Sequence, residues 1–240
     1  MTTKEFSDEF DILVSSYRRF RDFDHKEPSD TVEFNEYEKS LFLTESQEEI
    51  VLSLYTGRNS SGNSFEETEE LRRYLSPLIS EALLEPAVQE NTIGISDHSE
   101  FFELPQDVWF ITYESVHLLD NTCDSLTTIE VRPVTQDEYH RIKQNPFKGA
   151  NDRRALRLDL HDNVVEIVSK FNILEYYIRY LKQLKPIILE SLPDGMTIKG
   201  ISAETPCELH ESLHRRILER AVERALMSKA GTSARQNTQT

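Results

Sequence analysis

The spacing of the hydrophobic residues changes near residue 100, and this change constrains the fold more than any other feature of the sequence. In the first part these residues recur as on one face of an α-helix, and Phe6, Phe10 and Val14 begin the pattern. In the second part apolar and polar residues alternate as in half-buried β-strands, most clearly over residues 108–119. The sequence therefore predicts an α+β fold, with an N-terminal helical part and a C-terminal part that is mainly antiparallel β-sheet and carries a terminal amphipathic helix.

Capping and turn residues divide these two parts into individual elements. The expected helices of the first part cover residues 5–21, the segment from a capping box at Thr44 and Gln47 to Gly57, and the segment from a capping box at Ser64 and Glu67 to Ile79. The expected strands cover residues 108–119, 127–134, 155–160, 164–168, 173–181 and 186–189, with a short helix after Thr135 and a last helix over 209–227. We therefore expect an acidic helical region (1–98), a β-rich region with a short helix (99–205), and a C-terminal helix with a polar tail (206–240).

The charge of the chain is strongly negative and unevenly spread. There are 43 acidic and 27 basic residues, a net charge of −16, of which residues 1–104 carry −15 and residues 105–240 carry −1. Tight binding of nucleic acid requires clustered Lys and Arg, so the acidic part is not expected to bind DNA tightly. Its surface could lie beside a basic partner, line a passage through which DNA slides, or serve solubility alone.

The sequence lacks the patterns that several classes of function require. No hydrophobic run approaches the ~18 residues of a membrane-spanning helix, and the first ten residues carry three acids and no basic head of a signal peptide. No glycine-rich phosphate-binding motif occurs, and Cys123 and Cys207 are too few for a disulfide framework. We expect no membrane association and no cofactor.

One motif that suggests catalysis is His210-Glu211-Ser212-Leu213-His214, which matches the HExxH pattern of zinc proteases. Two histidines four residues apart share a helix face and could hold one zinc ion, with Glu211 as general base. However, the motif lies in the first turn of its helix, and two arginines directly follow His214. We expect His210 near the helix N-cap, His214 at a surface or interface, and no metal. A zinc-dependent hydrolase stays as the alternative.

A basic segment near the middle of the β-rich region is the candidate contact surface. Its cations surround the loop Asn145-Pro146-Phe147-Lys148-Gly149 and include only one nearby acid, Asp152. The candidate residues are Arg141, Lys143, Lys148, Arg153, Arg154 and Arg157. A basic loop with one exposed aromatic could touch nucleic acid or meet the acidic part of a neighbouring subunit. We favour the contact with protein because the chain as a whole is acidic.

Four stretches of the sequence resemble a known family. They are residues 37–51 with YEKS and LTESQEEIV, residues 145–157 with NPFKG and RRALR, residues 176–189 with YYIRYL, and residues 207–222. They are spread along the chain between Tyr37 and Leu226. In these stretches the chain resembles virion neck proteins from tailed phages of the crAss-like group.

The resemblance implies a non-enzymatic virion protein that forms a ring between portal and tail. Such rings usually follow the twelve-fold symmetry of the portal and enclose the DNA channel. The implied partners are further copies of the chain, the portal protein, neighbouring neck or tail proteins, and packaged DNA that passes without sequence-specific binding. The protein would be made in the host cytoplasm and located in the virion. Besides the zinc hydrolase, a soluble adaptor for a basic protein partner remains open.

Overall fold

The computed structural model describes residues 1–21, 33–58, 67–87, 94–96, 98–120, 125–161, 163–193 and 195–236. The chain divides into two compact units, of which the first combines Met1–Leu78 with Leu184–Thr240 and the second is Ile79–Gln183. The second unit is therefore inserted into the first. The expected α+β fold is confirmed. None of the helices in the described part of the chain is long and apolar enough to cross a membrane.

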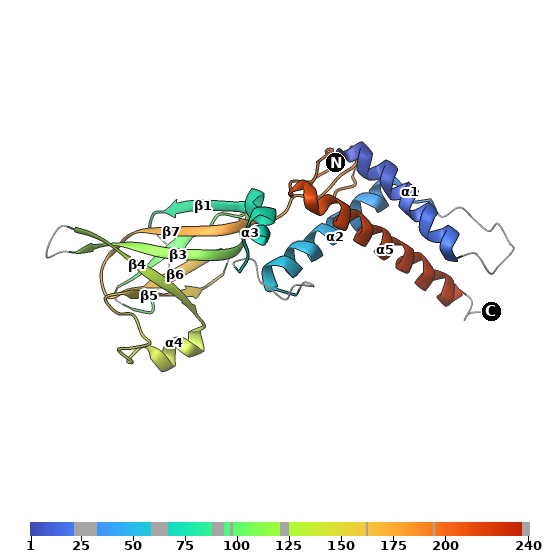
Figure 1. Cartoon of the computed structure of the whole chain (residues 1–240). Helices are drawn as coiled ribbons and strands as arrows, with labels where there is room; N and C mark the ends of the chain where they lie inside the picture. The colour runs from blue at the N-terminus through green and yellow to red at the C-terminus, as the bar shows by residue number, and fades with distance from the viewer. Residues whose placement is uncertain are drawn as a thin grey trace. The chain divides into compact units, whose positions relative to one another are not determined.

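The first unit consists of helices (Figure 1). They are α1 (Thr3–Arg21), α2 (Glu36–Thr56), α3 (Glu69–Leu75), the 3-10 helix η2 (Ser76–Leu78) and α5 (Glu211–Gln236). Helix α2 packs along α5, and α1 contacts both. The fully or nearly fully buried residues that form this core include Phe6, Phe10, Leu43, Val51, Leu54, Leu213, Ile217, Leu218 and Val222. The expected helical periodicity thus places one apolar face of each long helix inside the unit.

Helix α2 begins earlier than expected. Its N-cap is Asn35, whose side chain accepts the Glu38 N–H at 2.8 Å, while the Glu38 carboxylate accepts the Asn35 N–H at 3.1 Å. The capping box expected at Thr44 and Gln47 is wrong, because both residues lie inside the helix. Both are buried, and they hydrogen-bond the backbone of residues 185–187, where the chain returns to the first unit. The two side chains that resemble a helix cap therefore make a tertiary contact between α2 and residues 185–187.

The ends of the second and third helices follow the expectation in part. Gly57 ends α2 in the left-handed conformation with φ 74°, as expected. Helix α3 begins after Thr68, whose side chain accepts the Leu71 N–H, whereas the expected cap Ser64 lies outside the described residues. The helix was expected to reach Ile79, but Ile79 is the first residue of a strand.

Although charge is uneven along the sequence, the two units have the same net charge. Counted over the sequence, the first unit has 17 basic and 25 acidic residues and the second has 10 and 18, so each carries −8. The main reason is that residues 79–104, with six acids and no Lys or Arg, belong to the second unit. Helix α5 also brings arginines to the acids of α2. Arg220 lies 2.6 Å from Glu49, and Arg224 lies 2.8 Å from Glu45. Part of the negative charge of α2 is thus paired within the chain.

The second unit is one seven-stranded sheet with a helix on it (Figure 1). The elements are β1 (Ile79–Leu84), β2 (Ser99–Glu103), β3 (Val108–Asp120), β4 (Ser125–Val134), α4 (Gln136–Ile142), β5 (Arg154–Asp159), β6 (Val164–Val168) and β7 (Ile173–Lys182). The strand order is β1-β7-β3-β4-β5-β6-β2. All neighbouring strands are antiparallel except β4 and β5, which run parallel because α4 carries the chain back between them.

Most of the expected strands are confirmed, and one is wrong. Residues 186–189 form no strand; in this segment Ile188 makes only an isolated bridge with Thr205, and Ser40 accepts the Leu189 N–H. The segment lies in the first unit. There, side chains of α2 make the backbone hydrogen bonds that a neighbouring strand would make in a sheet. The turn expected at residues 161–163 joins β5 and β6, although Asp162 lies outside the described residues.

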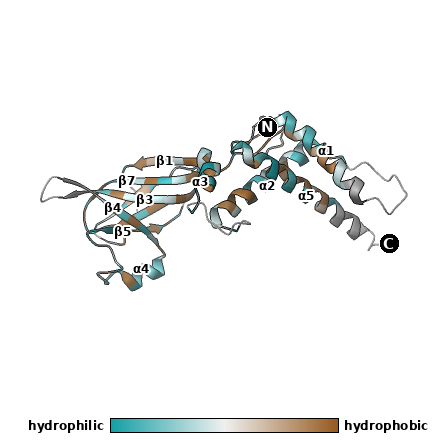
Figure 2. Ribbon diagram, viewed as in Figure 1, coloured by the Kyte–Doolittle hydropathy of each residue, from teal (hydrophilic) through white to brown (hydrophobic). Residues whose placement is uncertain are grey.

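The two faces of β5 explain where α4 lies. On one face Ala155 joins the main core, which includes Phe102 and Tyr176. On the other face Leu156 and Leu158 pack with residues of α4, Tyr139 and Ile142, in a second buried cluster. Brown hydrophobic and teal hydrophilic residues alternate accordingly along the strands in Figure 2. Helix α4 is therefore fixed on the sheet, and the loop that follows it starts from a rigid support.

Candidate functional site

The candidate contact surface is the end of α4 together with the connection to β5, which we call the basic loop (residues 141–153). Helix α4 starts at the expected cap, where the Thr135 hydroxyl accepts the Glu138 N–H at 3.2 Å. It ends at Ile142, which is buried against the sheet. The loop rejoins the sheet at Arg154, the first residue of β5. Both ends of the basic loop are thus held by the core of the second unit.

Hydrogen bonds within the basic loop hold its shape. The Asn145 side-chain oxygen accepts the N–H groups of Phe147 at 2.9 Å and Lys148 at 3.3 Å, and the Asn145 carbonyl accepts the Gly149 N–H at 2.8 Å. The Asn151 side-chain oxygen accepts the Arg153 N–H at 2.9 Å. These are the asparagine turns that need no external partner. The loop therefore has a defined conformation before any partner binds.

Gly149 allows the chain to turn closely on the end of α4. A Cβ atom at this position would lie 2.9 Å from the Asn145 carbonyl oxygen and 3.0 Å from that of Ile142. Both are backbone atoms, which cannot move aside as a flexible side chain can. A side chain at residue 149 would therefore push the loop away from α4 and change the direction in which it presents its residues.

The basic loop presents one large hydrophobic side chain to solvent. Phe147 is 85% exposed, the largest exposure among the large hydrophobic residues of the described chain. The cations around it, Arg141, Lys143, Lys148 and Arg153, are exposed as well and form no ion pair with any described residue. Arg154, at the start of β5, donates to the Phe147 carbonyl at 3.2 Å and so helps to hold the loop against the sheet. An exposed aromatic ring within a group of free cations is typical of a binding surface.

Arg157 does not belong to this surface. Its side chain is mostly buried and lies 2.8 Å from Glu114 and 2.9 Å from Asp159. Glu114 is 7% exposed and also accepts the Tyr176 hydroxyl at 2.5 Å. Burial raises the pKa of Glu114 and of Tyr176, whereas the nearby Glu114 carboxylate helps to hold the pKa of Arg157 above its ordinary value. The structure thus separates Arg157, a buried structural cation, from the other five candidates.

The two histidines of the HExxH motif make contacts within the first unit. His210 lies directly before α5 and caps it, as expected, because its Nδ1 accepts the Ser212 N–H at 3.3 Å. His214 was expected at a surface or interface; it is not at the surface, because it is 5% exposed and packs on Phe6 of α1. Its Nε2 lies 3.0 Å from the Leu209 carbonyl and its Nδ1 lies 2.8 Å from the amino group of Met1. Both ring nitrogens are therefore occupied. Over the described residues, no group of three or more His, Cys, Asp or Glu is placed to hold a metal ion.

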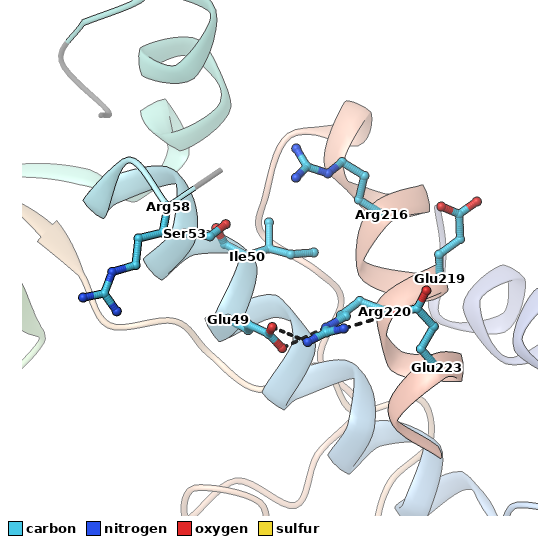
Figure 3. A pocket seen from close by; sticks show the side chains of 8 residues that line it. All are labelled: Glu49, Ile50, Ser53, Arg58, Arg216, Glu219, Arg220 and Glu223. Atoms are coloured by element: carbon cyan, nitrogen blue, oxygen red, sulfur yellow. Dashed lines mark hydrogen bonds and ion pairs between the residues drawn. The ribbon is translucent and has the colours of Figure 1, made fainter. Parts of the chain in front are cut away.

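The other surface feature of interest is a cleft between α2 and α5 in the first unit. It consists of two adjoining hollows of about 370 and 780 Å³. Figure 3 shows the side chains around the smaller hollow, where Arg220 and Glu49 face each other. The larger hollow is lined by Glu45, Glu48, Glu49, Leu52, Ser53, Thr56, Arg58 and Arg224. Sequence reasoning missed this cleft, because it forms only where two helices far apart in the chain meet.

Comparisons with known proteins agree along almost the whole chain. Residues 1–237 match the model of a family described as phage tail ring protein 3/4. The chain is 46% identical over 232 residues to "Ring protein 3" of Bacteroides phage crAss001, a match that covers 95% of this chain and 96% of that protein. It is 29% identical over 242 residues to "Ring protein 4/5" of the same phage, with coverage of 96% and 94%.

Proposed function

The chain belongs to the phage tail ring protein 3/4 family of crAss-like phages, and from this we infer that it forms a ring in the phage neck, between the portal and the tail. It is a structural ring protein of the virion. The observation that carries the proposal is the match over residues 1–237, which includes both units and the basic loop. We propose twelve copies in the ring, in register with the portal, and contacts with the neighbouring neck or tail proteins.

Closed rings set a physical requirement that the chain can meet. Copies related by rotation about a ring axis contact each other through two different surfaces, one on each side of the subunit. The basic loop supplies one candidate surface, with Arg141, Lys143, Lys148, Arg153 and Arg154 around Phe147. A structural role without catalysis is supported by the occupied ring nitrogens of His214 and by the N-capping role of His210.

We also propose that the ring encloses the channel through which packaged DNA passes. Both units carry a net charge of −8, and an acidic protein repels the phosphate backbone. DNA could therefore move along such a channel without adhering to its wall. Such passage needs no sequence-specific binding of DNA.

Light scattering of the full chain, alone and mixed with the portal protein of the same phage, tests the proposal. We expect about twelve copies to bind one portal ring, because a closed ring stacked on the portal shares its rotational symmetry. A monomer alone is compatible with assembly on a template, so the mixture is the decisive sample. A chain that stays monomeric with portal present would favour the adaptor, and one that also carries stoichiometric zinc would favour the hydrolase.

A further inference from the structure

The basic loop and the α2–α5 cleft have complementary properties, and they lie on different units of the chain. The loop presents an aromatic ring among free cations, whereas the larger hollow of the cleft has an exposed leucine among three carboxylates and two arginines, Arg58 and Arg224. We infer that Phe147 of one copy inserts into the α2–α5 cleft of the neighbouring copy and anchors the ring. This inference rests on the proposed ring function and names the two surfaces that such a ring requires.

The loop has the properties of an anchor. Among the exposed large hydrophobic residues that the structure describes, Phe147 has the largest exposed fraction. Its burial in an interface would therefore remove a large apolar area from water. The Asn145 and Asn151 hydrogen bonds fix the backbone on both sides of it, so little conformational entropy is lost when the loop binds. Aromatic anchors that fill a pocket, with polar contacts around them, carry most of the affinity in many interfaces.

The cleft has the properties of the matching pocket. The larger hollow is big enough for an aromatic ring, and Leu52, which is 38% exposed, supplies an apolar wall. Around it lie Glu45, Glu48 and Glu49, whose side chains keep between 29% and 49% of their surface exposed. Each already contacts a cation of its own unit, but a carboxylate has lone pairs for several donors. The free cations of the basic loop can therefore bind at the rim while the ring enters the hollow.

Charge favours a second copy over DNA as the occupant. A copy with a net charge of −16 repels another copy at most points of its surface. Arg141, Lys143, Lys148 and Arg153 of the basic loop form no ion pair with any described residue, so the loop can determine how two copies meet. DNA would be attracted to the same cations, but Leu52, the one hydrophobic residue that lines the larger hollow, suits contact with an aromatic side chain of a protein.

Disulfide cross-linking tests the contact directly. In a background with Cys123→Ser and Cys207→Ser, Phe147→Cys is combined with Leu52→Cys, and the chain is assembled on the portal protein and oxidised. A disulfide forms only when the two Cα atoms are within about 7 Å, so we expect a ladder of covalent multimers on a non-reducing gel. The matched control combines Phe147→Cys with Leu83→Cys, which is exposed on β1, and should give no ladder. A bond within one chain, or none with Leu52→Cys and Thr56→Cys in turn, would overturn the inference.

Assembly of point variants gives a second, independent test. We expect Phe147→Ser to weaken ring formation on the portal at least tenfold, and the matched surface control Leu83→Ser to leave it unchanged. We expect Lys148→Glu to weaken it as well, and Glu48→Lys in the same chain to restore part of the loss. If Phe147→Ser assembles like the unchanged protein, the anchor is wrong although the ring function stands. If the unchanged chain does not bind the portal, the ring function itself fails. A variant set at Lys143, Lys148 and Arg153 that loses DNA binding while it still assembles would show the loop to be a DNA contact.

Discussion

Replacement of Arg157 by methionine should destabilise the second unit strongly. The methionine keeps most of the volume but removes the charge that compensates Glu114, a residue only 7% exposed. Loss of one partner from a buried ion pair costs about 3–5 kcal/mol, because the other charge is left in a medium of low polarity. The Tyr176 hydroxyl still donates to Glu114, so we expect a value near the lower end, about 3 kcal/mol. For a unit of roughly 100 residues this corresponds to a fall in Tm of about 12–24 °C.

The double variant separates the pair from its surroundings. Glu114→Gln combined with Arg157→Met removes both charges and keeps an acceptor for Tyr176. Replacement of a whole buried pair by neutral side chains is often close to neutral, so we expect the double variant to regain at least about 2 kcal/mol over the single one. The loss in the single variant should also depend on pH. Burial already raises the pKa of Glu114, and removal of the arginine raises it further. The unfolding free energy of Arg157→Met should therefore increase as the pH falls from 8 towards 5.

The single tryptophan makes the assay specific to this unit. Trp109 lies in β3, where it stacks on Phe110, so its fluorescence during urea unfolding follows the sheet and not the helical unit. The free energy of unfolding is obtained by linear extrapolation for the unchanged, single and double variant proteins. A loss below about 1 kcal/mol for Arg157→Met, with no dependence on pH, would refute the reasoning, because it would mean that water reaches Glu114 freely.

Three further predictions follow from features of the two units. Gly149→Ala should keep the fold of the sheet, as seen by Trp109 fluorescence, but weaken assembly on the portal, because its Cβ would meet the Asn145 carbonyl oxygen at 2.9 Å; unchanged assembly would contradict this. Burial lowers the pKa of His214 from its usual 6.5, so the unfolded chain takes up this proton more readily and the unfolding free energy should fall as the pH drops below about 6.5. His214→Asn should flatten that slope in urea titrations followed by circular dichroism, and an unaltered slope would assign it to other groups. Purified protein should contain no zinc by elemental analysis, and Glu211→Gln should not change its assembly, whereas stoichiometric zinc would bring back the hydrolase.

The periodicity of the sequence predicted the type of most elements but not how they associate. Helical spacing predicted α1 and α5, and alternation predicted β3, because one face of each is buried. A polar turn between two apolar runs predicted β5 and β6. Gly57 was recognised as the end of α2, since the left-handed conformation favours glycine. Thr44 and Gln47 were misread as a cap, because the same hydroxyl and amide groups that cap helices also bind the backbone of a distant segment.

The candidate surface could be predicted only where its residues are close in sequence. The cations of the basic loop are close in sequence, so their cluster is visible without a structure. Arg157 lies near them in sequence, but strand alternation turns it towards Glu114, which is 43 residues away in the chain. His214 was expected at a surface or interface because two arginines follow it, and it lies on the side of α5 that faces Phe6. Contacts between distant segments decide these cases, and local sequence holds no record of them.

The insertion of one unit into the other determines the order in which the protein is completed during synthesis. The ribosome releases α1 and α2 first, then the whole sheet unit, and α5 only at the end. Until then Leu43, Val51 and Leu54 on α2 lack the helix that covers them, whereas the continuous sheet unit can already fold. The cleft between α2 and α5 therefore exists only on a chain that has been translated through its last helix. An incomplete chain would have the basic loop but no cleft, so it could occupy one side of a neighbour and would leave the ring open at its other side.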